Sequence, residues 1–193
     1  MKAKRLKAVT PPGILIYPHL NEPDREFDAM GIYHTKMRVS GADAQEFMDK
    51  VATFRDEQYQ QECSQRGKKK LNQNPLPWSE DEESEGEFIV KFKLKAKVVT
   101  RTGDSWEQRP AILDASLKPT TVSVGGGTKA RISVEANFYC TPAGDTGVTL
   151  WCKAVQVIDL VERGGAGDFG FAATEGFSDE ATGTEDLMGA ADF

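Results

Sequence analysis

The strongest constraint on the fold is a strict two-residue alternation from residue 88 to residue 99. Apolar residues hold one phase and lysines hold most of the other: Phe88, Val90, Phe92, Leu94, Ala96 and Val98 alternate with Ile89, Lys91, Lys93, Lys95, Lys97 and Val99. Successive side chains of an extended strand point to opposite faces. The segment is therefore predicted to be one strand with an apolar face toward a core and a cationic face away from it.

The rest of the pattern indicates a mainly β protein with one helix. Further strands are predicted at 14–17, 31–40, 111–117, 128–139 and 148–161. Apolar residues recur at helical spacing from Ala42 until Gly67, which predicts one amphipathic helix. Residues 18–28 and 66–87 have the composition of loops. Without βαβ alternation, this order favours a closed OB-fold barrel with one inserted α-helix over a parallel sheet.

Charge divides the chain into a basic body and acidic segments. The net charge is −6, but the last thirty residues hold seven acidic side chains and no lysine or arginine. Residues 1–163 therefore carry 24 basic and 23 acidic side chains. Six more acids cluster at 80–87, so the sequence predicts two detachable anionic segments on a basic body.

We expect an OB-fold domain at 1–163 and a disordered acidic C-terminal tail at 164–193, because the tail has too few apolar residues to fold alone. A basic body indicates a polyanionic ligand, for which a mobile anionic tail can compete. The alternative is that the tail only maintains solubility.

The lysine face is the first candidate binding site. Lys91, Lys93, Lys95 and Lys97 advance along a strand by about 6.6 Å per pair of residues, a spacing suited to the phosphates of an extended single strand. Lys129 and Arg131 alternate with core residues in a later strand and extend the same pattern. The alternative is that these are solvated side chains that discourage edge pairing.

Aromatic side chains are the second component, because bases stack on exposed rings. The candidates are Tyr33, Trp106, Tyr139 and Trp151. For each single ring, burial in the core is the alternative interpretation.

Signals of an enzyme or of a cofactor are missing from the sequence. The segment 125–129 lacks the order of a phosphate-binding loop and is not followed by a helix pattern. His19 and His34 lack metal-ligand spacing, and the three cysteines fit neither a disulfide framework nor a zinc site. Cys152 is expected in the core. No secretion signal or membrane span is expected. We predict a protein that is not an enzyme and needs no metal or cofactor.

The order of several motifs resembles the single-stranded DNA-binding proteins of short-tailed bacteriophages. These motifs span nearly the whole chain: Gly31-Ile32-Tyr33 before a strand, the helix, Arg66-Gly67-Lys68-Lys69, Phe88 to Lys93, Gly125-Gly126-Gly127-Thr128-Lys129, and an acidic tail that closes on Asp192-Phe193. The family's usual tail is richer in acids, and Met30 stands where a basic residue is usual.

The resemblance implies an OB fold that coats and anneals single-stranded DNA without sequence preference, in phage DNA replication and recombination. It also implies a location in the cytoplasm of the infected bacterial host and the possibility of a homodimer. The tail would dock on the phage DNA polymerase and helicase-primase through Phe193, with Asp186 and Asp192 providing charge. The alternative from another class is a protein-binding OB-fold adaptor that binds no nucleic acid.

Overall fold

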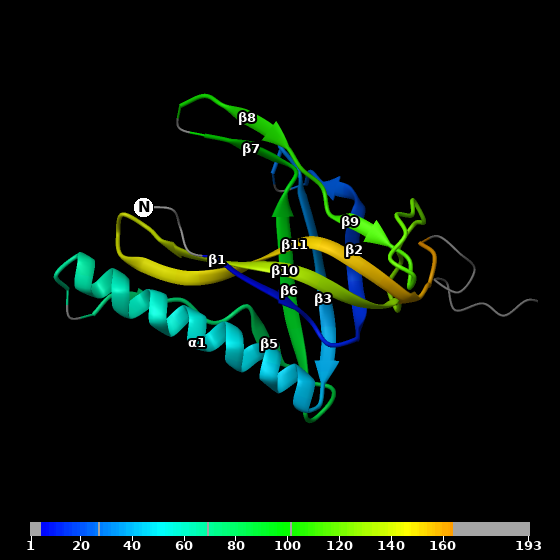
Figure 1. Ribbon diagram of the computed structural model, residues 1–193, viewed down its shortest axis with the longest axis horizontal. Coiled ribbons are helices and arrows are strands. Elements are labelled where there is room, and N and C mark those ends of the chain that lie inside the picture. Colours follow the sequence, from blue (N-terminus) through cyan, green and yellow to red (C-terminus); the bar gives the residue numbers. More distant parts are fainter. Residues whose placement is uncertain (1–4, 27, 69, 101, 164–193) are drawn as a thin grey trace, which may run out of the picture.

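Five strands close into a barrel (Figure 1). The computed structural model describes residues 5–163 apart from residues 27, 69 and 101. The barrel strands are β2 (Gly13–Asp24), β3 (Ile32–Ser40), β6 (Glu87–Lys95), β10 (Lys129–Cys140) and β11 (Asp145–Asp159). Neighbours follow the order β10-β2-β3-β6-β11, and β11 pairs again with β10. If the five strands are numbered along the chain, their order around the closed barrel is 1-2-3-5-4. This order is the Greek-key connection of an OB barrel.

Six shorter strands extend this barrel or lie beside it. They are β1 (Arg5–Val9), β4 (Asn72–Gln73), β5 (Trp78–Glu80), β7 (Lys97–Val99), β8 (Ser105–Glu107) and β9 (Ala111–Leu113). β1 pairs with β10, β5 with β6, and both β4 and β9 with β11. β7 and β8 form a separate two-stranded hairpin that projects from the barrel (Figure 1).

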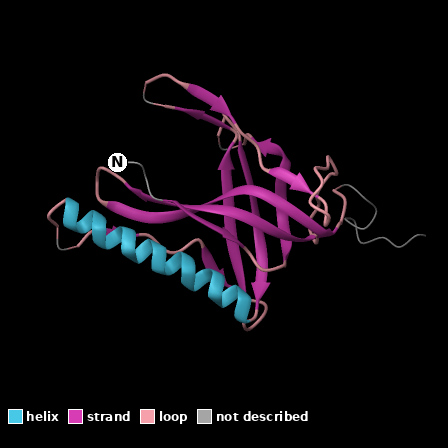
Figure 2. Ribbon diagram, in the orientation of Figure 1, coloured by secondary structure: helices cyan, strands magenta, loops and turns pink. Residues whose placement is uncertain are grey.

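The helix α1 (Ala42–Gln65) connects β3 to the strands that follow. Gly41 precedes it with a φ of 84°, in the left-handed region that glycine adopts without strain. Phe47, Met48 and Val51 are buried where α1 contacts β1, β3, β10 and β11, and Figure 2 shows the helix along one side of the sheet. No helix among the described residues is long and apolar enough to cross a membrane.

The core follows the predicted alternation. Val90, Phe92 and Leu94 of β6 are buried, and so are Ala130 and Ile132 of β10. Cys152 is also fully buried, and burial raises the pKa of its thiol to about 12, so it is a core residue and not a nucleophile. The prediction of a mainly β OB-fold barrel with one inserted helix is confirmed.

The predicted strand at 88–99 is wrong in one respect, because it is interrupted at Ala96. The Ala96 N–H donates to the Gly31 carbonyl at 2.8 Å, and the Ala96 carbonyl accepts from the Gln108 N–H at 2.8 Å. These two contacts turn the chain out of the barrel. Lys97 therefore lies in β7 of the hairpin and not in β6.

Other boundaries also differ from the predictions. The predicted loop at 18–28 is strand as far as Asp24, because β2 accommodates Pro18 and Pro23 in a stretch with an irregular register. Residues 66–87 contain β4 and β5, whereas 111–117 is strand only as far as Leu113. β1 was not predicted, since a five-residue strand beside two prolines has too short a pattern.

Candidate nucleic-acid interface

The outer face of β3 and β6, here called the β3–β6 face, carries four lysines. In the antiparallel register Lys36 lies opposite Lys91, His34 opposite Lys93, and Ile32 opposite Lys95. Residues directly opposite one another project from the same face of a sheet. Lys36, Lys91, Lys93 and Lys95 are all exposed, and none of them forms an ion pair within the described part of the chain. Like charges placed opposite one another destabilise a bare sheet, so this face favours an anionic ligand.

Trp151 continues this face onto β11. It lies opposite Lys93 in the parallel pairing of β11 with β6, and its side chain is half-buried. The Arg5 guanidinium lies 4.7 Å from the centroid of its ring, a cation–π contact. Arg5 also forms an ion pair with Glu135 at 3.3 Å. The Trp151 ring is therefore held in place beside the lysines, by a residue of β1.

Tyr139 of β10 lies on the same side of the β6 lysines as Trp151, because β10 pairs with β11 there. Its hydroxyl accepts a hydrogen bond from the Asn74 amide at 2.9 Å, which fixes the half-buried ring. Together with Pro77 and Thr149, it lines a hollow of about 250 Å³ that also contacts Lys91 and Lys93.

A second hollow, of about 330 Å³, lies against the opposite side of the same two lysines. Its lining includes Asp24, His34 and Lys36. The hollows share Lys91, Phe92 and Lys93, so together they form a shallow path across β6. An extended ligand can cross the strands there while its anionic groups stay near the ammonium groups.

A larger hollow of about 680 Å³ lies at the end of β6 nearest the hairpin. It is lined by Arg25 and Met30 before β3, and by Lys97 and Arg109 near the hairpin. The lining contains three cationic side chains and one acidic side chain, Glu107, so a net positive charge extends from the β3–β6 face to this end of the barrel.

The acidic segment 80–87 is part of the fold and not a detachable segment. β5 pairs with β6, and Asp81 and Glu87 contact Arg38 at 2.7 and 3.4 Å. A hydrogen bond from the Glu83 N–H, with help from Arg38, lowers the pKa of Asp81. These acids neutralise Arg38 at the end of the β3–β6 face and leave the lysines beyond it unpaired.

No family model matches the chain. No curated protein matches its sequence. Among solved structures, the chain is similar to gp2.5, a single-stranded DNA-binding protein encoded by bacteriophage T7. The TM-score is 0.71 at 18% identity, covering 83% of this chain and 95% of gp2.5. The chain has the gp2.5 fold.

A second similar structure is the single-stranded DNA-binding protein from bacteriophage Enc34, solved in complex with single-stranded DNA. Its TM-score is 0.51 at 14% identity, and the match covers 83% of this chain and 89% of that one. At 18% and 14% sequence identity, the similarity to these two structures concerns the fold alone. The role of each residue depends on the geometry of this chain.

Apart from Tyr33, the residues predicted from sequence fall into four groups. Lys91, Lys93, Tyr139 and Trp151 lie together, with Lys95 next along β6. Lys97 and the exposed Trp106 lie on the hairpin, and Lys129 and Arg131 lie on β10, which does not pair with β6. Asp186, Asp192 and Phe193 lie outside the described residues.

One predicted stacking residue, Tyr33, lies apart from the β6 lysines. Tyr33 lies opposite Leu94, is 7% exposed and belongs to the core side of β3, where it lines the hollow of about 680 Å³ at the end of the barrel. Sequence reasoning also missed Arg5 and Lys36. The signal for Lys36 was present, because it shares the alternating phase of His34 and Arg38. No local pattern could place Arg5 over Trp151, since 146 positions separate them in the chain.

Proposed function

We propose that this chain is a non-enzymatic, sequence-independent single-stranded DNA-binding protein that uses the β3–β6 face. The observation that carries the proposal is the exposed, unpaired set of lysines at 36, 91, 93 and 95 beside the Trp151 ring. The gp2.5 fold and the sequence resemblance to the phage proteins support it.

Binding rests on two interactions that do not read sequence. Lysines along β6 neutralise phosphates, with about 6.6 Å between alternate residues. Bases stack on Trp151, and Tyr139 borders the hollow beside it. Every base has a flat face and every nucleotide a phosphate, so this arrangement favours all sequences alike.

A charge-matched pair of triple variants tests the proposal. Lys91→Ala/Lys93→Ala/Lys95→Ala removes three charges from the β3–β6 face. Lys50→Ala/Lys68→Ala/Lys118→Ala removes three exposed lysines from α1 and two loops. We expect the first variant alone to weaken oligo-dT binding, with a salt slope shallower by roughly 0.7 per lost contact. Equal affinities and slopes for the two folded variants would contradict the use of the β3–β6 face. Absence of oligo-dT binding by the parent would contradict DNA binding altogether and favour a protein-binding adaptor.

We further propose that the chain acts in phage DNA replication and recombination, anneals complementary strands, and contacts the phage DNA polymerase and helicase-primase through its tail. Support comes from the resemblance and from the tail's composition, in which an aromatic ring and acids end an otherwise small and polar segment. The ring would fill a pocket while Asp186 and Asp192 steer the approach.

Phe193→Ala tests the role of the tail without changing charge. We expect weaker binding to the polymerase or helicase-primase in surface-plasmon titrations, unchanged oligo-dT affinity, and partial retention of partner binding by Phe193→Trp. If Phe193→Ala binds both partners as tightly as the parent, the aromatic ring is not the anchor.

A further inference from the structure

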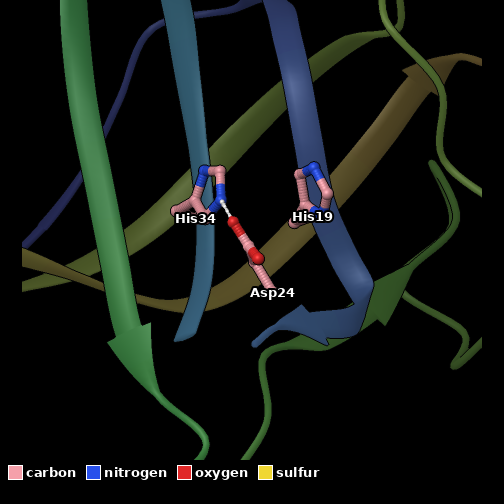
Figure 3. Close-up of side chains that lie close together, drawn as sticks. All are labelled: His19, Asp24 and His34. Carbon is pink, nitrogen blue, oxygen red and sulfur yellow. Dashed lines mark hydrogen bonds and ion pairs between the residues drawn. The ribbon is translucent and has the colours of Figure 1, made fainter. Parts of the chain in front are cut away.

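Two histidines and one aspartate meet where β2 and β3 pair irregularly (Figure 3). The possible ligand atoms of His19, Asp24 and His34 all lie within 4.8 Å of one another. The His19 and His34 rings stack with centroids 4.7 Å apart, and His34 Nε2 lies 3.1 Å from Asp24 Oδ2. The sequence analysis predicted no metal site, because these residues lack a recognisable spacing.

Two irregularities in β2 create this cluster. Ile16 lies opposite Lys36, so a regular ladder would place His19 opposite Tyr33, whose side chain is buried. One extra residue in β2 instead places His19 opposite His34. Three more extra residues place Asp24 opposite Ile32, on the same face of β3 as His34. Bulges of this kind redirect side chains and are common beside functional sites.

The backbone at the first irregularity is strained. Tyr17 has a φ of 47°, a left-handed conformation that is unusual for a residue other than glycine. Such residues cost about 1–3 kcal/mol and cluster at functional sites. Here the strained residue is the one that turns His19 toward His34.

The orientation of Asp24 and the pKa shifts of Asp24 and His19 also suit a metal site. Asp24 Oδ1 accepts a hydrogen bond from the Glu26 N–H at 2.8 Å, which leaves Oδ2 facing His34. That hydrogen bond, together with the one from His34, lowers the pKa of Asp24. Burial and the neighbouring His34 lower the pKa of His19. Metal ions bind neutral imidazole and ionised carboxylate, so the lowered pKa values of His19 and Asp24 both favour the form that binds a metal.

We propose that His19, Asp24 and His34 bind a divalent transition-metal ion of the zinc class, with a fourth position open to the hollow lined by Lys36 and Lys93. Imidazole ligands favour zinc-class ions over Mg²⁺ and Ca²⁺, which prefer oxygen ligands. At zinc–ligand distances of about 2.1 Å, tetrahedral ligand atoms lie roughly 3.4 Å apart. The Asp24–His34 pair is already at 3.1 Å, so mainly His19 must move closer.

Metal binding by these three residues does not depend on whether the chain binds DNA. Its test uses untagged full-length protein stripped of metal with a chelator. Co²⁺ is added while the visible absorption of the bound ion is followed, and Zn²⁺ is then used as competitor. We expect one ion per chain, displacement by Zn²⁺, and no displacement by excess Mg²⁺.

Variants assign the ligands. His19→Ala, His34→Ala and Asp24→Asn should each weaken Co²⁺ binding by at least about tenfold, since even a lost supporting contact costs 10–100-fold. Cys63→Ala/Cys140→Ala is the matched control, because thiols also bind zinc, and it should bind as the parent does. Absence of binding, unchanged affinity in the histidine variants, or loss in the cysteine variant would overturn the proposal.

A measurement on the parent protein covers the case of a variant that does not fold. The chain has two histidines. Both imidazole ring signals should therefore shift in NMR spectra when Zn²⁺ is added to one equivalent. If the ring signals stay in place while Zn²⁺ binds, the ion is held elsewhere and the proposal is wrong.

Discussion

At the scale of single residues, Trp151 and Tyr33 show how the strand phase decides the role of an aromatic ring. Trp151 shares a face with Lys93, whereas Tyr33 lies opposite Leu94 inside the barrel. The sequence already contained this distinction, because Tyr33 has the phase of Met37 and Val39, both of which are buried. The contact of Arg5 with Trp151 was beyond prediction, since it depends on the pairing of β1 with β10.

Trp151→Ala should weaken oligo-dT binding by about 1–3 kcal/mol, the usual contribution of one stacked base. Trp151→Phe should lose less, because a smaller ring still stacks. Trp106→Ala is the matched comparison, since that ring is exposed on the hairpin away from the β6 lysines. This variant should lose less affinity for oligo-dT than Trp151→Ala does. Fluorescence anisotropy of labelled oligo-dT provides the measurement. A larger loss for Trp106→Ala than for Trp151→Ala would move the centre of the site to the hairpin.

At the scale of elements, periodicity predicted the strands well wherever the register is regular. The alternating segments in β6 and β10 and the helical spacing in α1 correspond to the observed elements. Prediction failed where a tertiary contact overrides the local pattern. Ala96 continues the alternation in sequence, but its hydrogen bonds to Gly31 and Gln108 end β6. In β2, two prolines indicated a loop, but bulges accommodate them within the strand.

Gly13→Ala tests how closely β2 and β3 pack. An added Cβ would lie 2.5 Å from the Arg38 carbonyl oxygen and 2.7 Å from Met37 Cγ, so backbone would have to move. We expect the free energy of unfolding to fall by about 1–3 kcal/mol, the usual cost of overpacking. Gly126→Ala is the control, because its added Cβ meets nothing closer than 4.0 Å. Equal midpoints for the two variants in urea unfolding would contradict the tight packing.

At the scale of the whole molecule, charge distribution is the feature that the sequence predicted in part. The separation of an acidic C-terminal segment from a body with a net charge of +1 is a property of composition alone. The role of the 80–87 acids was not predictable, because it depends on Arg38 reaching Asp81 across 43 positions of the chain. The lysines of β6 were predictable from their alternation. Which residues of β3 and β11 lie beside them was not predictable, because the pattern within one strand does not give the register between strands.

Deletion of residues 164–193 should raise the affinity for oligo-dT at low salt. It changes the net charge from −6 to +1, and it removes a tethered anion that competes for the lysines. The difference should shrink as salt screens the attraction. A tail of equal length with its seven acids replaced by the corresponding amides is the control and should behave like the deletion. Equal affinities of parent, deletion and control at low salt would show that the tail does not compete.

The central claim is that single-stranded DNA binds across the β3–β6 face and stacks on Trp151. The most direct measurement is a fluorescence titration with oligo-dT of the variant Trp78→Phe/Trp106→Phe, in which Trp151 is the remaining tryptophan of three. The predicted result is quenching that saturates with oligo-dT, reverses on addition of salt, and is much weaker with duplex DNA at the same concentration. Emission that stays unchanged through micromolar oligo-dT at low salt, from a variant that remains folded, would contradict the account.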